Sequence, residues 1–426
     1  MSLPNKSRIL MVDDHPIQCL RVKQMLEDAG LGPVDTTLGA RQALAMLRHQ
    51  TYDLVLVDLH MPGMDGVQFI NALSGVQWVP LLAIVSSCSR RLMNCVSLMA
   101  KEKGIAVIGT FPKPLGVEHV LEIAGALGAS QDSPLQLKPE SEPVFDRLEL
   151  EQAIAQRELK ARFQPRKSLA SGKIVGAEAL VRWHSPSFGL LMPVSFLASI
   201  TQHKLDRDLL FLMLDDAIQA QKHWQALGHR ITVSVNLPTA LLEDPDLPDQ
   251  LHQITSRAGL AASDICFELL ETERPESAGR YHMGASRLRL KGFGLAQDDF
   301  GMGYSSMYSL ISTPFTEVKI DRNFVNGAAA DEFRAAALVA AVQLGRQLGL
   351  EVVAEGVESL DDLEFLRRIG CDSVQGYLIS AALELDAFSQ FLGCSVVTSF
   401  SSPTGPVFSH PCQISPYDAS RETSVD

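Results

Sequence analysis

The most constraining feature of this sequence is a repeated alternation of short apolar runs with amphipathic stretches. Residues 146–394 contain eight strand-like runs, and helical patterns separate most of them. The runs are ARFQP, KIVGAEALVRW, ITVSVNL, DICFELLE, GLAQDDFG, EVKID, EVVAEGVE and SVQGYLIS. Because eight strands in about 250 residues is typical of a closed barrel of alternating strands and helices, this part is predicted to be a (β/α)8 TIM-like barrel.

The same alternation occurs on a smaller scale over residues 7–125, with the runs RILMVDD, YDLVLVDLH, VPLLAIVSS and IAVIGTFPKP. Runs rich in Val, Ile and Leu that are separated by amphipathic helices indicate a buried parallel sheet, and hence an α/β fold. The composition then shifts toward Ser, Pro, Gln and Glu, which predicts a linker over residues 126–146. Residues 395–426 are rich in Ser, Thr and Pro and are predicted to be a disordered tail.

Charge and composition exclude several classes of protein. Of the 426 residues, 37 are Lys or Arg and 50 are Asp or Glu, so the net charge is −13. An acidic chain is a poor candidate for broad DNA or anionic-membrane binding, and no basic DNA-reading helix is recognisable. The seven cysteines form no CxxC pair, which argues against a disulfide framework or a structural zinc site.

A membrane location is not expected either. The N-terminus lacks the apolar segment of a signal peptide. Residues 66–89 carry no charge, but polar side chains and Pro80 interrupt them, so they do not form a continuous apolar span. The sequence therefore predicts a cytoplasmic protein without membrane insertion.

Most strand-like runs of the second part finish in a polar side chain. In a parallel barrel the C-terminal strand ends meet at one mouth, where active sites lie. The side chains expected there are Glu178, Asn236, Glu268, Glu271, Asp298, Asp299, Lys319, Asp321, Glu355 and Gln375.

So many carboxylates cannot all stay ionised without compensation. Oxygen ligands without a His or Cys cluster favour Mg²⁺ or Mn²⁺, and two such ions could support hydrolysis of a phosphate ester. Each acid taken alone is equally typical of a solvated loop, a helix cap, a turn or a surface ion pair. Their shared position at one end of the strands favours a site.

The set of motifs resembles the EAL family of cyclic di-GMP phosphodiesterases over residues 147–393. The motifs are FQP (163–165), EALVRW (178–183), VNLP (235–238), ELLE (268–271), DDFGMGYSS (298–306), KID (319–321), EGVE (355–358) and QGY (375–377). The resemblance implies hydrolysis of one phosphodiester of cyclic di-GMP to give linear pGpG. A sensor that binds the dinucleotide without cleaving it, or a protein-interaction module, remains the alternative.

The resemblance also implies roles for individual residues. Metal ligands would be Glu178, Asn236, Glu268 and Asp298, with Asp299 reaching a second Mg²⁺ or Mn²⁺ ion. Glu355 would be the general base, and Lys319 would hold a water or a phosphate oxygen. Glu271 would anchor the loop 299–306, and the substrate contacts would be Gln164, Leu180, Arg182 and Gln375.

Three positions depart from the family pattern without removing a proposed ligand or base. Leu270 stands where the family usually has Thr, and Pro238 stands where Ser is usual. Met302 replaces the common Thr or Ala of the loop.

A second group of acids and a lysine lies at strand ends of the first part. Clustered carboxylates can bind Mg²⁺, and one can accept a phosphoryl group, although a solvent-facing acidic rim has the same pattern. The motifs VDDH, VDLHMPGMDG and FPKP resemble a response-regulator receiver domain over residues 7–125, which implies a five-stranded doubly wound parallel sheet. Asp58 would then be phosphorylated, with Asp13 and Asp14 holding one Mg²⁺, Ser86 as the switch hydroxyl and Lys113 binding the phosphoryl group.

The receiver resemblance implies partners as well as a site. Phosphorylation would come from a cognate histidine kinase or phosphotransfer protein, and a homodimer or higher oligomer is expected because both families often self-associate. Receiver domains often carry an aromatic switch residue three positions before the lysine, whereas this chain has Thr110 there and Phe111 one place later.

Overall fold

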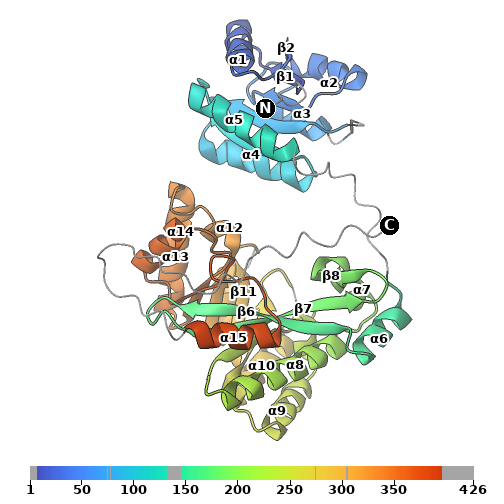
Figure 1. Cartoon of the computed structure of the whole chain (residues 1–426), viewed down its shortest axis with the longest axis vertical. Coiled ribbons are helices and arrows are strands. Elements are labelled where there is room, and N and C mark those ends of the chain that lie inside the picture. Colours follow the sequence, from blue (N-terminus) through green and yellow to red (C-terminus); the bar gives the residue numbers. More distant parts are fainter. Residues whose placement is uncertain are drawn as a thin grey trace. The chain divides into compact units, whose positions relative to one another are not determined.

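The computed structural model describes residues 7–73, 75–76, 78–131, 145–273, 275–303 and 306–395. The chain divides into two compact units between Glu140 and Ser141, and each is described by itself (Figure 1). The predicted tail lies outside the described residues except for its first residue, and so does most of the predicted linker.

The first unit alternates strands and helices without interruption. Its elements are β1 (Ile9–Val12), α1 (Pro16–Asp28), β2 (Val34–Thr37), α2 (Ala40–His49), β3 (Leu54–Val57), α3 (Gly66–Leu73), β4 (Leu81–Ser86), α4 (Arg90–Glu102), β5 (Val107–Pro112) and α5 (Val117–Gln131). The strand order is β2-β1-β3-β4-β5, and every pair is parallel. The predicted five-stranded, doubly wound parallel sheet is therefore confirmed.

Apolar side chains fill both faces of this sheet. Strands β1 and β3 are buried at every position, as expected of parallel strands covered on both sides. Two separate apolar clusters result, one on each face. Helix α5 continues to Gln131, six residues into the segment assigned to the linker.

The described residues of the second unit form nine strands. They are β6 (Leu159–Ser168), β7 (Ile174–Ser185), β8 (Gly189–Leu191), β9 (Thr232–Asn236), β10 (Ile265–Leu270), β11 (Gly294–Phe300), β12 (Glu317–Ile320), β13 (Glu351–Ala354) and β14 (Ser373–Val374). The order is β6-β14-β13-β12-β11-β10-β9-β7-β8, and β6 also pairs with β7. Eight strands thus close on themselves, which confirms the predicted barrel.

One strand differs from the all-parallel arrangement assumed from the sequence. Strand β6 is antiparallel to both of its neighbours, β7 and β14, while the other pairs within the barrel are parallel. Strand β7 pairs with β9 only over residues 176–179 and then continues to Ser185, where it pairs with β6 and β8. Glu178 therefore lies in the middle of β7 rather than at its end.

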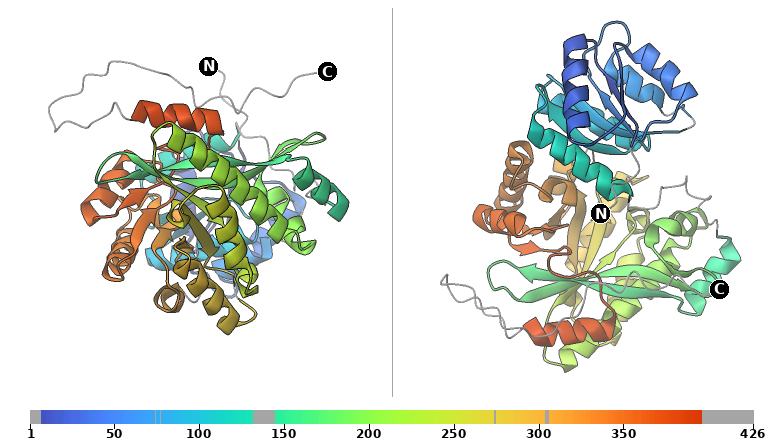
Figure 2. Two further views of the ribbon diagram at one scale, coloured as in Figure 1. Left: turned by 90° about the horizontal axis from the view of Figure 1, so that it is seen from below. Right: turned by 45° about the horizontal axis from the view of Figure 1, so that its top comes forward.

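Helices surround the barrel. They are α6 (Arg147–Ala155), α7 (Leu197–Gln202), α8 (Asp206–Ala226), α9 (Leu247–Arg257), α10 (Ala278–Leu290), α11 (Ser306–Ser312), α12 (Arg322–Val325), α13 (Glu332–Gln347), α14 (Leu360–Ile369) and α15 (Leu385–Ser395), with short 3-10 turns η1 (Pro193–Ser195), η2 (Thr239–Glu243) and η3 (Ala262–Asp264). Figure 2 shows α8 and α15 beside the long strand β6. Phe163 of β6 contacts Trp224 and Phe388 there, with ring centroids 5.1 and 6.2 Å apart.

The residues on the inner side of the barrel are unusually polar. Parallel pairing puts Glu178 beside Ser234, and Asn236 beside Glu268, on the same face. Arg166, Glu317 and Lys319 are also buried. Barrels of this type are commonly filled by branched apolar side chains, so this interior is adapted to hold charge.

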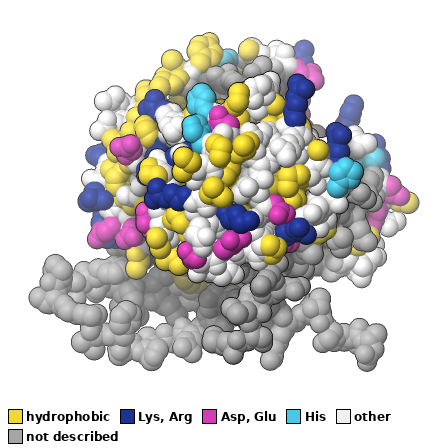
Figure 3. Space-filling model, turned by 90° about the horizontal axis from the view of Figure 1, so that it is seen from above, with side chains coloured by type: hydrophobic (Ala, Val, Ile, Leu, Met, Phe, Trp, Pro, Cys, Tyr) yellow, Lys and Arg dark blue, Asp and Glu magenta, His cyan; other side chains and the backbone are white. Residues whose placement is uncertain are grey.

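The surface mixes charge and apolar groups. On the face shown in Figure 3, acidic and basic side chains lie interspersed with hydrophobic ones. Among the described residues, none of the helices combines the length and the apolar character needed to span a bilayer.

Candidate active site

The side chains predicted at the barrel mouth converge on one lysine. Nζ of Lys319 lies 2.7 Å from Oε1 of Glu355 and 2.8 Å from Oε2 of Glu268. It also lies 3.1 Å from both Oε2 of Glu178 and Oδ1 of Asp298. Lys319 is only 1% exposed, so the alternative of a solvent-exposed ion pair does not hold for it.

Burial and charge set the protonation of this cluster. Burial alone would lower the pKa of Lys319, but the surrounding carboxylates raise it well above its usual value. Burial raises the pKa of Glu268 and of Glu355 well above the ordinary range, because Lys319 only partly offsets the loss of water. The pKa of Glu178 is instead lowered, since Lys319 and a hydrogen bond from Gln375 outweigh its burial.

The local backbone directs the side chains of two consecutive residues, Asp298 and Asp299, into the same site. On a regular strand Asp298 and Asp299 would face opposite sides. The pairing of β11 with β12 is irregular between Gln297 and Phe300, and Asp299 has a φ of 54°, a left-handed conformation that Asp tolerates better than most residues. Oxygen atoms of Asp298, Asp299 and Glu355 consequently lie within 4.8 Å of one another.

The donor set fits divalent metal ions. A second group of oxygens, from Glu178, Glu268 and Asp298, also lies within 4.8 Å, and Oε1 of Glu268 is buried without a partner among the described residues. Burial and the neighbouring Asp298 and Asp321 raise the pKa of Asp299 to about 6. Several buried carboxylates with spare lone pairs are suited to Mg²⁺ or Mn²⁺.

The predicted substrate contacts lie beside this cluster, on β6, β7 and the end of β14. Gln375 donates from Nε2 to Oε2 of Glu178 at 2.6 Å and to Oε1 of Gln164 at 3.1 Å. Arg182 and Leu180 lie further along β7, and both are half-buried. Arg182 donates to the backbone carbonyl of Val181 at 2.8 Å.

The remaining predicted groups lie close to the site or cap local structure. Asn236 forms a hydrogen bond with Glu178 that helps lower its pKa. Glu271 accepts a hydrogen bond from the backbone N–H of Gly301 at 2.7 Å, so the anchor contact exists with Leu270 in the motif. Asp321 caps α12 by accepting from the N–H of Asn323 at 2.8 Å.

Two of the departures from the family pattern leave this geometry in place. Pro238 is the N-cap residue of the 3-10 turn η2 and lies two residues after Asn236, which ends β9. Met302 is 51% exposed, lies in the loop next to Gly301, and accepts a weak hydrogen bond from Nδ2 of Asn323 at its sulfur.

The first unit holds a second cluster of acids and a lysine. Nζ of Lys113 lies 2.6 Å from Oδ2 of both Asp13 and Asp58, and Ser86 donates to Oδ1 of Asp58 at 2.7 Å. Hydrogen bonds to the two aspartates outweigh burial and raise the pKa of Lys113. Oxygen atoms of Asp13 and Asp14 lie within 4.8 Å of each other and of the His15 ring.

The aromatic residue near Lys113 is a core residue. Phe111 is buried in one of the two apolar clusters, and its ring centroid lies 5.8 Å from that of His119. Thr110, which occupies the usual aromatic position, is only half-buried.

Two charged residues of the site region were not predicted from the sequence. Arg166 and Glu317 form a buried ion pair inside the barrel. Each is two residues from a predicted site residue, Arg166 from Gln164 and Glu317 from Lys319. Because side chains two apart on a strand share a face, this spacing was the available signal.

Comparisons with known proteins agree with both sites. Residues 147–382 match the EAL domain family, and residues 9–119 match the response regulator receiver domain family. The chain therefore belongs to the EAL family and carries a receiver domain ahead of its EAL domain.

Similar proteins share one or both parts. The cyclic di-GMP phosphodiesterase RocR of Pseudomonas aeruginosa is 28% identical over 389 residues, which cover 91% of this chain and 99% of RocR. The bifunctional diguanylate cyclase/cyclic di-GMP phosphodiesterase MucR of the same species is 37% identical over 232 residues, or 54% of this chain. These residues are 34% of MucR, so the chain spans about a third of that relative.

Solved structures resemble the barrel. The PaMucR phosphodiesterase in complex with c-di-GMP has a TM-score of 0.53 and 35% identity, covering 56% of this chain and 97% of that chain. An EAL domain protein from Listeria monocytogenes has a TM-score of 0.52 and 28% identity, covering 59% and 98%.

Proposed function

We propose that this chain is a response regulator whose EAL domain hydrolyses cyclic di-GMP to linear pGpG, with a water activated by divalent metal ions. The observation that carries the proposal is the set of four carboxylates gathered around Lys319 at the mouth of the barrel. The match to RocR over nearly the whole of both chains supports the same substrate.

The chain's own residues divide the work. Glu178, Asn236, Glu268 and Asp298 would hold one ion, and Asp299 would reach the second. When bound, the ions neutralise the phosphate and lower the pKa of a nearby water. Glu355 would accept the proton of the attacking water, and Lys319 would hold a water or a phosphate oxygen.

Substrate binding falls to side chains around the cluster. Arg182 carries a guanidinium suited to a phosphate oxygen. Gln164 and Gln375 form a hydrogen-bonded pair at the site and offer amide groups to the dinucleotide. Glu271 holds the backbone of Gly301 and so keeps the loop after Asp299 near the metal ligands.

The test of activity is chromatography of cyclic di-GMP incubated with the purified protein and Mg²⁺, with and without a chelator. Chelator-sensitive formation of pGpG supports the proposal. Bound dinucleotide without product would instead indicate a sensor.

The role of Glu355 has a separate test. Glu355→Ala should abolish turnover while largely preserving dinucleotide binding, because the variant loses the proton acceptor but keeps the proposed metal ligands. Glu364→Ala, at an exposed position of α14, is the matched control and should turn over normally. Near-normal turnover of Glu355→Ala would show that another group is the base.

We further propose that phosphorylation of Asp58 modulates this activity. Asp58 already contacts both Lys113 and Ser86, the groups that would hold the phosphoryl oxygens. Turnover of the wild type and of Asp58→Asn should be measured with and without a small phosphodonor. A donor effect confined to the wild type supports the proposal, and four equal rates would refute it.

A further inference from the structure

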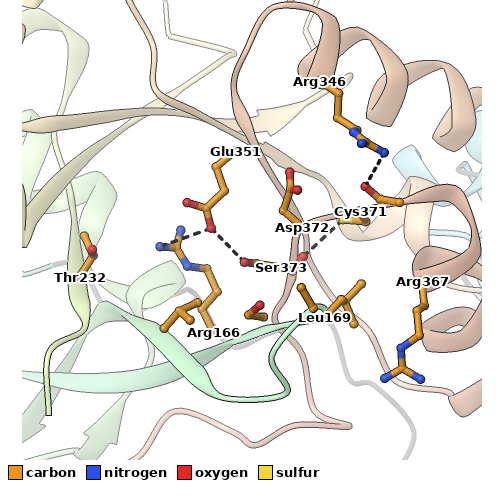
Figure 4. Close-up of a pocket in the computed structure, with 13 residues that line it drawn as sticks. Arg166, Leu169, Thr232, Arg346, Glu351, Arg367, Cys371, Asp372 and Ser373 are labelled. Atoms are coloured by element: carbon orange, nitrogen blue, oxygen red, sulfur yellow. Dashed lines mark hydrogen bonds and ion pairs between the residues drawn. The ribbon is translucent and has the colours of Figure 1, made fainter.

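A second pocket lies at the opposite end of the barrel from the Lys319 cluster. Its volume is about 610 Å³, and Figure 4 shows it between the barrel strands and the adjoining helices. Residues from the last part of β6 and the first residues of β9, β13 and β14 line it, namely Arg166, Thr232, Glu351 and Ser373. None of the residues assigned above to catalysis lines this pocket.

A buried arginine forms the inner wall of this pocket. Arg166 is 6% exposed, and it pairs with Glu317 and, at 4.0 Å, with Glu351. Its Nε has no partner among the described residues. A Cβ at Gly176 would stand 2.9 Å from that Nε, so the glycine makes the room that the guanidinium occupies.

Two further arginines, Arg346 and Arg367, lie at the rim of the pocket, and the contacts given for each use only part of its N–H donors. The hydrogen bond of Arg346 to the carbonyl of Gly370 is 3.4 Å long, and the ion pair of Arg367 with Glu364 is 4.0 Å long. A guanidinium has five N–H donors. Gly370 has a left-handed φ of 79°, and a Cβ there would overlap Nη1 of Arg346. As with Gly176 and Arg166, the missing side chain of the glycine leaves the space that the guanidinium occupies.

The two acids that line the pocket are already engaged by the chain. Glu351 accepts from Oγ of Ser373 at 2.9 Å, besides its contact with Arg166. Asp372 accepts from the backbone N–H of Val352 at 2.9 Å. Burial, and then the charge of Arg367, lowers the pKa of Lys167, which indicates that positive charges are crowded at this end of the barrel.

We propose that this pocket binds a small molecule carrying a phosphate group. In Figure 4, Arg166 lies on one side of the pocket, and Arg346 and Arg367 lie on the other. Guanidinium groups match phosphate oxygens in pairs of parallel hydrogen bonds. Arg346 and Arg367 therefore supply the contacts to the phosphate, and the unpartnered Nε of Arg166 lies on the opposite wall.

The test is isothermal titration calorimetry of the full chain with inorganic phosphate and with glycerol 3-phosphate, and with uncharged glycerol as the comparison. A chelator is present throughout, so that metal-dependent phosphate binding at the two acidic sites does not contribute. The double variant Arg346→Ala/Arg367→Ala should bind both anions roughly tenfold or more weakly, since charged hydrogen bonds are lost. Arg334→Ala, an exposed arginine also on α13, should bind as the wild type does.

The outcomes separate the site from non-specific attraction. Binding of both anions but not glycerol, lost only in the double variant, supports the proposal. Equal loss in Arg334→Ala, unchanged binding in the double variant, or no binding to the wild type would overturn it. Arg367→Glu, a single change at an exposed position, repeats the test if the double variant melts at a lower temperature. Because the measurement is of binding, it does not depend on the proposed phosphodiesterase activity.

Discussion

Replacing Lys319 by Met should make the stability of the metal-free barrel strongly dependent on pH. In the part of the chain that the structure describes, Lys319 is the one cation within 3.1 Å of Glu178, Glu268, Asp298 and Glu355. Met has a similar length and fills the space, so the loss of stability is mainly electrostatic. Removing one partner of a buried ion pair lowers the free energy of unfolding by about 3–5 kcal/mol.

The pH dependence follows from the carboxylates left behind. The folded-state pKa values of Glu268, Asp298 and Glu355 are already raised by burial and rise further without the ammonium. The pKa of Glu178 rises too, because Lys319 is a main cause of its lowering, so the native variant binds more protons than the unfolded chain. Destabilisation then grows as the pH rises through those pKa values. Toward acid pH the carboxylates take up protons, which replace the missing positive charge, and the difference from the wild type shrinks.

The assay is thermal unfolding of the chelator-treated protein at pH 6 and pH 8. A loss of 3–5 kcal/mol corresponds to a lower melting temperature by roughly 10 °C for a domain of this size. Saturating Mg²⁺ should reduce the difference in melting temperature between the variant and the wild type. An ion that binds only the native state stabilises it, and its charge replaces that of Lys319. The control is Lys291→Met, which removes a surface pair with Asp249 and should change the melting temperature much less, because exposed ion pairs contribute little to stability.

Two results would refute this reasoning. A loss below 1 kcal/mol at pH 8 would mean that Lys319 is not what holds the carboxylates together. A gap that widens toward acid pH would mean that the sign of the linkage is wrong.

Further predictions concern the interior of the barrel and its proposed metal ligands. Gly176→Ala should lower the free energy of unfolding by about 1–3 kcal/mol, because a Cβ there would crowd Arg166. The control is Gly279→Ala on α10, where a Cβ would meet nothing within 4 Å and no such loss is expected. Urea unfolding of both variants checks this. The affinity for Mg²⁺ should fall as the pH drops through about 6, where Asp299 takes up a proton. In Mg²⁺ titrations at pH 5, 6 and 7, Asp299→Asn should weaken this dependence of the affinity on pH. An unchanged pH dependence in that variant would mean that another group takes up the proton.

The barrel mouth was predictable because its residues follow a rule of parallel strands. Asn236 ends β9, and Glu355 follows β13 directly. Side chains at such positions meet wherever the strands are parallel and closed into a barrel. The family motifs then narrowed a generic acidic mouth to a particular set of ligands.

Other features leave no such signal. The alternation of apolar and polar residues along a strand does not indicate its direction relative to its neighbours, so the antiparallel pairing of β6 was not predicted. The left-handed φ of Asp299 depends on the irregular pairing with β12, which is a tertiary effect. The shift in composition toward Ser, Pro, Gln and Glu predicted a linker from residue 126, whereas α5 continues to Gln131, because a change in composition does not mark the exact end of a helix.

The reversed direction of β6 decides where the polypeptide enters the catalytic domain. In an all-parallel barrel the first strand would begin at the base, far from the reacting groups. Here β6 begins with Leu159 opposite Trp183, beyond the mouth, and descends to Ser168 opposite Ser373 at the base. Strand β6 therefore joins the barrel at the end that carries the proposed metal ligands, and Gln164 follows the first residue of the strand, Leu159, by only five positions.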